Sequence, residues 1–85
     1  MSIKGITDEE IDNLVADGLR LLKKGKYNSV SRYLFQRSLK LDGQLATITF
    51  VELQKIGALS NAEMNEHGVL ISLVDHEKLK ELTTN

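Results

Sequence analysis

The middle of the chain carries side chains suited to contacts with a nucleic acid. Between Arg20 and Ile56, eight basic residues oppose two acidic ones, a balance of +6 in a chain whose net charge is −1. Cationic and hydroxyl side chains bind phosphate groups, which gives salt-sensitive affinity without sequence information. An amide such as that of Gln44 can pair with the edge of adenine, and Thr47 and Gln54 can contact bases more weakly. The predicted DNA-contact residues are Ser31, Arg32, Arg37, Lys40, Gln44, Thr47 and Lys55.

Two short helices are predicted to hold these side chains. Ser31 caps the first helix, which ends near Lys40, and Asp42 caps the second after a tight connection. Gly57 ends the second helix. The apolar stripe of this second helix consists of Ala46, Phe50, Leu53 and Ile56. Two helices joined by so few residues are typical of a helix-turn-helix.

A further helix is predicted on each side of this pair. Residues 7–10 (Thr-Asp-Glu-Glu) form a capping box that begins an amphipathic helix, and Gly25 ends that helix. Near the other end of the chain, Asp75 caps a short helix that presents Leu79 and Leu82 to the core.

The segments between the helices predict a small amount of β-structure. Residues 27–30 form a brief extended segment. Segments 58–59 and 69–74 are the two apolar arms of a β-hairpin, joined by the polar residues 60–68. The predicted fold is therefore α+β, a winged helix-turn-helix with a three-helix core, a small antiparallel β-hairpin wing and a short C-terminal helix.

Length and composition favour one domain over residues 1–85, with 1–6 flexible and 83–85 frayed. The chain has no cysteine and no apolar run of the ~20 residues that a membrane span needs, so a cytoplasmic location and no membrane partner are expected. A nucleophile elbow and a glycine-rich phosphate loop are both absent, so no enzyme activity is expected. His67 and His76 lack the spacing of metal ligands, so neither a metal nor another cofactor is expected.

Five short stretches of the chain carry a resemblance to a known family. They are Ser29–Ser31, Gln36–Arg37, Leu39–Leu41, Ala46 and Gly57–Ser60. Through them, the chain from 29 to 73 resembles in part the winged-helix γ domain of the FtsK/SpoIIIE DNA translocases. The resemblance implies a DNA-binding module whose third helix reads a short DNA sequence. Near the start of that helix the family has arginines and an asparagine, whereas this chain has Gln44, Leu45 and Ile48.

Two functions are expected from these observations. The first is a small DNA-binding protein, a transcription regulator or an accessory factor of the kind that mobile elements encode. It would contact double-stranded DNA through the second and third helices, and a homodimer would gain specificity from two half-sites. Glu63 and Glu66, near the tip of the predicted wing, would repel phosphates.

The alternative is a protein-interaction module, either an inhibitor or an assembly factor. Leu45, Ile48 and Val51 are predicted to form an apolar strip on the outer face of the third helix. An exposed apolar strip of this kind usually marks a protein partner.

Overall fold

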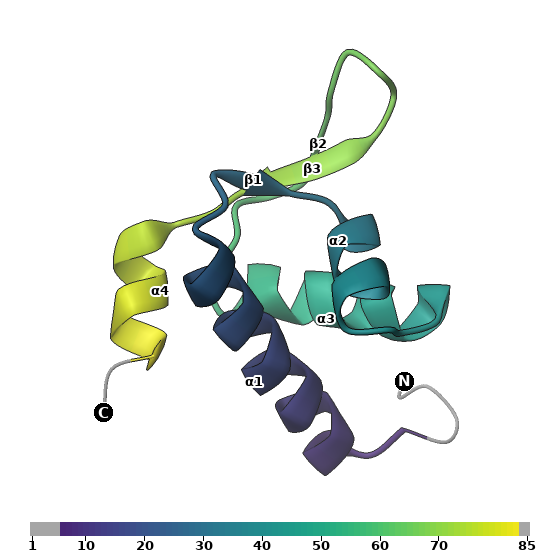
Figure 1. The fold of residues 1–85 in the computed structure, drawn as a ribbon, viewed down its shortest axis with the longest axis vertical. Coiled ribbons are helices and arrows are strands. Elements are labelled where there is room, and N and C mark those ends of the chain that lie inside the picture. The colour runs from purple at the N-terminus through teal and green to yellow at the C-terminus, as the bar shows by residue number, and fades with distance from the viewer. Residues whose placement is uncertain (1–5, 84–85) are drawn as a thin grey trace.

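The structure, a computed structural model, describes residues 6–83. Over this range the chain forms four helices and a three-stranded antiparallel sheet, so the domain is α+β (Figure 1). The elements in chain order are α1 (Asp8–Gly25), β1 (Ser29–Val30), α2 (Arg32–Ser38), α3 (Gly43–Lys55), β2 (Glu63–Met64), β3 (Leu70–Leu73) and α4 (His76–Thr83). Thr83, predicted to fray, belongs to α4, and its hydroxyl donates to the Leu79 carbonyl at 2.8 Å. The predictions for residues 1–5 and 84–85 lie outside the described range.

Local backbone chemistry sets both ends of α1. The Thr7 hydroxyl accepts a hydrogen bond from the Glu10 N–H at 3.1 Å, which confirms the cap at the start of the helix. At the other end the chain leaves the helix at Lys26, which lies in the left-handed region with φ +52°. The sequence predicts Gly25 as the C′ residue, just beyond the helix, and this placement is wrong. Gly25 is the last helical residue, and a Cβ there would overlap the ring of Tyr27.

α2 and α3 pack against each other around two aromatic rings. The ring centres of Phe35 and Phe50 lie 6.3 Å apart, and both side chains are buried. The predicted cap of α3 is confirmed, because the Asp42 carboxylate accepts from the Leu45 N–H at 2.8 Å. Ser31 stands at the cap position of α2, but its side chain makes no capping hydrogen bond within the described structure. In the connection between the two helices, the N–H groups of Leu39 and Leu41 donate to the carbonyls of Phe35 and Gln36, both at 3.0 Å.

The sheet has β3 in the centre, with β1 on one side and β2 on the other. The predicted pairing of the hairpin is wrong in one arm. Segment 58–59 contributes a single bridge, between Leu59 and Val74. The hairpin strand that pairs with β3 is instead Glu63–Met64, which the sequence predicts as part of the loop. Ala58 and Leu59 are instead buried in the core directly after α3.

Asn65 explains where the hairpin turns. Its side-chain oxygen accepts hydrogen bonds from the N–H groups of His67 and Val69 at 2.8 and 3.0 Å. Gly68 completes the turn with φ +76°. These bonds close a tight turn, so strand pairing continues up to Met64 and is not confined to the base of the hairpin.

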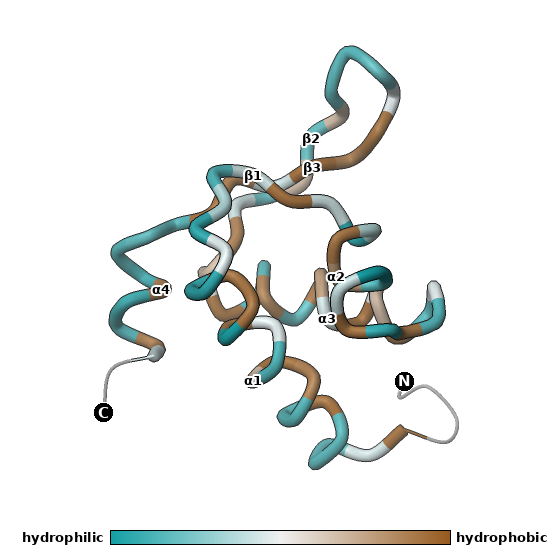
Figure 2. The backbone as a smooth tube through the Cα atoms, viewed as in Figure 1, coloured by the Kyte–Doolittle hydropathy of each residue, from teal (hydrophilic) through white to brown (hydrophobic). Residues whose placement is uncertain are grey.

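The core lies where α1, α2 and α3 meet below the sheet. Apolar and polar residues alternate along the helices, as amphipathic helices require (Figure 2). The buried apolar residues are Leu22, Val30, Phe35, Ala46, Phe50, Leu53, Ala58, Leu59, Val74 and Leu79. Ile56, predicted in the stripe of α3, is only half-buried.

α4 closes the domain against α1. The predicted cap is confirmed, because the Asp75 carboxylate accepts from the Lys78 N–H at 3.0 Å. Leu79 is buried as predicted, but the prediction for Leu82 is wrong, since this side chain is 37% exposed. Leu82 lies near the end of α4, about one turn beyond the part that Leu79 anchors in the core.

Candidate nucleic-acid interface

Arg37, Lys40 and Gln44 are three exposed residues of the predicted contact set, which also includes the exposed Arg32 and Lys55. The first three lie in the last turn of α2, in the connection and in the first turn of α3. Neither Arg37 nor Lys40 forms an ion pair with any residue from 6 to 83. Lys40 lies in the left-handed region with φ +55°. The structure thus brings two cations without an acidic partner and one amide to the same end of the helix pair.

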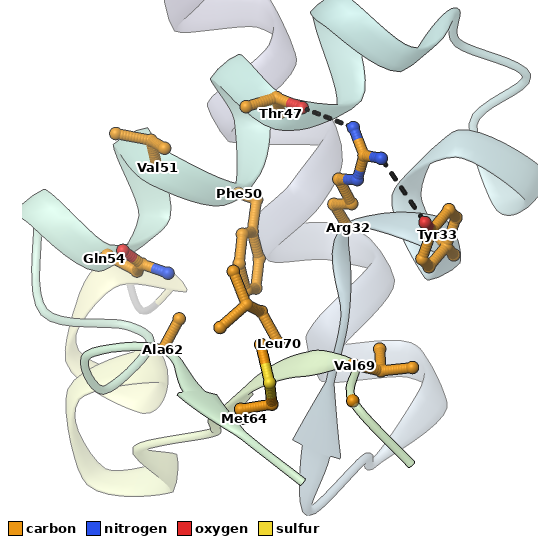
Figure 3. Close-up of a pocket in the computed structure, with 11 residues that line it drawn as sticks. Arg32, Tyr33, Thr47, Phe50, Val51, Gln54, Ala62, Met64, Val69 and Leu70 are labelled. Carbon is orange, nitrogen blue, oxygen red and sulfur yellow. Dashed lines mark hydrogen bonds between the residues drawn. The ribbon is translucent and has the colours of Figure 1, made fainter.

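Arg32 is held in place between α2 and α3. One terminal nitrogen of its guanidinium donates to the Thr47 hydroxyl at 3.2 Å, and the other donates to the Tyr33 hydroxyl at 3.3 Å (Figure 3). The guanidinium carbon lies 4.9 Å from the centre of the Tyr33 ring. Thr47 also donates to the Gly43 carbonyl at 2.8 Å, so its hydroxyl is engaged as donor and as acceptor. Thr47 therefore serves to hold Arg32 and is not free to read a base.

Gln54 and Lys55, toward the C-terminal end of α3, are engaged as well. The Gln54 amide donates to the hydroxyl of the buried Ser72 at 3.1 Å, which ties α3 to β3. The Lys55 ammonium forms an ion pair with Glu52 at 3.0 Å. Ser31 is half-buried before α2. Gln44 is consequently the one predicted base-reading side chain that makes no hydrogen bond within the described residues.

The residues of the predicted apolar strip differ in exposure. Leu45 and Ile48 are half-buried, and Val51 is 38% exposed. Val51 does not lie on a plain outer face of α3 as predicted. It lines a groove between α3 and the β2–β3 hairpin. The strip is therefore less exposed than the sequence predicts.

A groove, here called the α3–hairpin groove, lies between α3 and the β2–β3 hairpin (Figure 3). Its volume is about 560 Å³. Apolar side chains that remain exposed form much of its wall: Met64 is 65% exposed, Leu70 51% and Tyr33 48%. The other lining residues are Arg32, Thr47, Phe50, Val51, Gln54, Ala62, Gly68 and Val69. Arg32 is the one charged residue among them.

Met64, Leu70 and Tyr33 are absent from the predicted contact sets. The alternation of residues along 69–74 already places Leu70 on the same strand face as Ser72. The alternation does not reveal the strand register, which places Leu70 opposite Met64. The groove could be found from the sequence only with this pairing known.

The hairpin itself carries negative charge. Glu63 and Glu66 are exposed, and Glu66 lies 3.7 Å from the imidazole of His67. A phosphate that approached the hairpin would meet these carboxylates, so the electrostatics favour approach of DNA from the side of α2 and the start of α3.

Residues 6–83 contain no group of three side chains able to hold a metal ion, and no helix among them is long and apolar enough to cross a membrane. Comparisons with protein-family models, with curated proteins and with solved structures find no match to this chain.

Proposed function

We propose that this chain is a small winged helix-turn-helix protein that binds double-stranded DNA through α2 and the start of α3. A fold relationship to the γ domain of the FtsK/SpoIIIE translocases is part of this proposal. The observation that carries it is the position of Arg37 and Lys40, both exposed and without acidic partners, next to the exposed amide of Gln44. The order of helices and strands and the tight connection between α2 and α3 support the fold assignment.

The proposed interface has more groups for phosphate contacts than for reading bases. Arg37 and Lys40 would contact phosphates and supply affinity that falls as salt rises. Gln44 would be the principal group able to read a base edge, because Thr47 and Gln54 are engaged within the protein. We therefore expect low sequence discrimination by a single copy, which a homodimer on two half-sites would increase. A role as an accessory factor or regulator fits this balance.

The test is the binding of a mixed-sequence duplex to the double charge-reversal variant Arg37→Glu/Lys40→Glu. We expect wild-type affinity to fall steeply between 50 and 200 mM salt, and the variant to bind at least about tenfold more weakly at the lower salt. Because two phosphate contacts are removed, the slope of log affinity against log salt should decrease by about 2. Fluorescence anisotropy of a labelled duplex measures both quantities.

The matched control is Lys23→Glu/Lys24→Glu, at the end of α1. It makes the same change in net charge at exposed lysines that lie on a different helix. Equal losses in the two variants would indicate a general charge effect and contradict the proposed interface. Absence of wild-type binding at low salt would contradict DNA binding itself.

A second candidate function is protein binding, and the α3–hairpin groove favours it. Exposed apolar side chains from α2, α3 and the hairpin line this single hollow. Clustered apolar surface of this kind marks interaction sites more often than isolated exposed side chains do. An inhibitor or an assembly factor would use such a site.

A further inference from the structure

The α3–hairpin groove has a floor that belongs to the buried core. Phe50 is 6% exposed at its base and packs against the buried Phe35. The hydrogen bond from Gln54 to Ser72 fixes the hairpin to α3 along the groove. Because the core and this hydrogen bond hold the groove in shape before a ligand binds, binding costs little conformational entropy of the protein.

The walls of the groove are apolar and adaptable. Val51 from α3 and the hairpin residues Met64 and Leu70 project apolar atoms into water. Methionine, which is flexible and polarisable, is common at surfaces that accept varied apolar partners. Covering these three side chains would remove apolar surface from water, which is the main favourable term in association.

Arg32 supplies the one charge of the groove and can orient a bound ligand. Its guanidinium has five N–H donors, and the contacts with Thr47 and Tyr33 use two of them. No carboxylate among residues 6–83 forms an ion pair with it. A cation that is already oriented, and still has donors free, is complementary to a carboxylate on the occupant.

We infer that the α3–hairpin groove binds an amphipathic segment of another protein, which inserts apolar side chains between Val51, Met64 and Leu70 and pairs a carboxylate with Arg32. This inference rests on the second candidate function and is independent of DNA binding. The apolar walls require an apolar face on the occupant, and the open side of the groove leaves its other face, which must be polar, in water. Arg32 is complementary to an acidic residue of the occupant at the rim.

The composition of the rim favours a protein over other occupants. Arginine and tyrosine are the residue types enriched where few side chains carry most of the binding energy of a protein interface, and Arg32 and Tyr33 lie together here. Duplex DNA would have to approach the acidic hairpin residues Glu63 and Glu66 to reach the apolar walls. A small amphiphilic carboxylate could also pair with Arg32, but it lacks the extended apolar face that would cover Val51, Met64 and Leu70 together.

The experiment starts from a displayed library of 15-residue peptides, selected on the full-length protein. We expect the enriched peptides to share two or three large apolar residues and an aspartate or glutamate. A synthetic peptide of the consensus sequence is then titrated against variants by fluorescence anisotropy. Leu70→Ser and Met64→Ser should each weaken binding about tenfold or more.

Leu73→Ser is the matched control for Leu70→Ser. Both leucines belong to β3 and both are more than half exposed, but Leu73 does not line the groove. It should leave peptide affinity within about twofold of wild type. Circular dichroism of each variant checks that the fold is retained, and Met64→Ser, at the more exposed position, covers the case in which Leu70→Ser unfolds.

The carboxylate is tested by pairing variants of protein and peptide. Arg32→Gln should weaken binding of the consensus peptide about tenfold but hardly change binding of its analogue with glutamine in place of the acid. Arg37→Gln, outside the groove, should change neither. Enriched peptides that bind but need no acid, or that ignore Leu70→Ser and Met64→Ser, would overturn the inference while leaving protein binding as a function.

Three other outcomes would also overturn it. A library that yields no binding peptide would remove both the inference and the second candidate function. Decanoate that binds the groove when no peptide does would identify a small amphiphile as the occupant. Self-association that Leu70→Ser abolishes, measured by light scattering without peptide, would identify a second copy of this chain.

Discussion

At the scale of single residues, two lysines adopt a backbone conformation that disfavours side chains. Lys26 and Lys40 have φ of +52° and +55°, and this region costs a residue with a Cβ about 1–2 kcal/mol. Glycine avoids that cost, although its freer unfolded chain offsets about 0.4–1 kcal/mol of the gain. The lysine at position 40 thus lowers stability at a position where its charge would serve DNA binding.

Replacing Lys40 by glycine should therefore separate stability from function. For Lys40→Gly we expect the free energy of unfolding to rise by about 0.5 kcal/mol and Tm by about 2–4 °C, while affinity for duplex DNA falls several-fold at low salt. Lys26→Gly is the matched control, because it relieves the same conformation away from α2 and α3. Thermal denaturation and anisotropy measure the two effects. Equal DNA binding by both glycine variants would contradict a role for Lys40.

At the scale of elements, the packing of α1 on α3 depends on Gly18. A Cβ at this position would lie 2.9 Å from Leu53 Cδ1 and 3.1 Å from Thr49 Cγ2. Thr49 is fully buried and is fixed by the hydrogen bond from its hydroxyl to the Leu45 carbonyl at 2.8 Å. The two helices can approach this closely only because a glycine stands at their crossing.

Gly18→Val should consequently lower the free energy of unfolding by about 1–3 kcal/mol, because the added methyl groups have no space between Leu53 and Thr49. Gly43→Ala provides the contrast, since a Cβ there meets only a terminal nitrogen of Arg32, at 4.0 Å. At that open position alanine should be neutral or stabilise by up to about 1 kcal/mol. Chemical denaturation measures both. A neutral Gly18→Val would show that the helices separate readily.

The elements also show which information the sequence contains. Helix starts could be predicted because local side chains cap them: Thr7, Asp42 and Asp75 each accept the hydrogen bond that their position suggests. The hairpin could not, because its pairing depends on the turn at Asn65 and on burial of segment 58–59 in the core. Strand register is a tertiary property, and two-residue strands carry too little alternation to reveal it.

The candidate sites follow the same division. The exposed cations Arg37 and Lys40 could be predicted from residue type and helix position alone. The engagement of Arg32 with Thr47 could not, because it joins residues fifteen positions apart on different helices. The α3–hairpin groove could not be predicted for the same reason, since it exists only where the hairpin and α3 meet.

At the scale of the whole molecule, charge is separated along the chain. The cationic residues concentrate in the middle, whereas acidic residues dominate the start of α1 and the hairpin, and α4 holds two residues of each sign. A net charge of −1 therefore gives little overall attraction to DNA, and any binding depends on which face approaches. With the Debye length about 10 Å at 0.1 M salt, acidic groups close to the bound DNA oppose binding and more distant ones are screened.

This dependence on orientation makes neutralisation of the hairpin a test of how DNA would lie on the whole molecule. Glu63→Gln/Glu66→Gln removes two carboxylates from the hairpin, which the proposed winged-helix fold would place beside the duplex. Glu77→Gln/Glu81→Gln removes the same charge from exposed positions on α4. We expect the hairpin variant to raise affinity for duplex DNA about three- to tenfold at 50 mM salt, and the α4 variant to raise it less than twofold, because screening weakens the more distant charges. At 200 mM salt the difference should largely disappear.

Equal gains from both variants would mean that net charge alone governs binding, and no gain from either would place the hairpin away from the DNA.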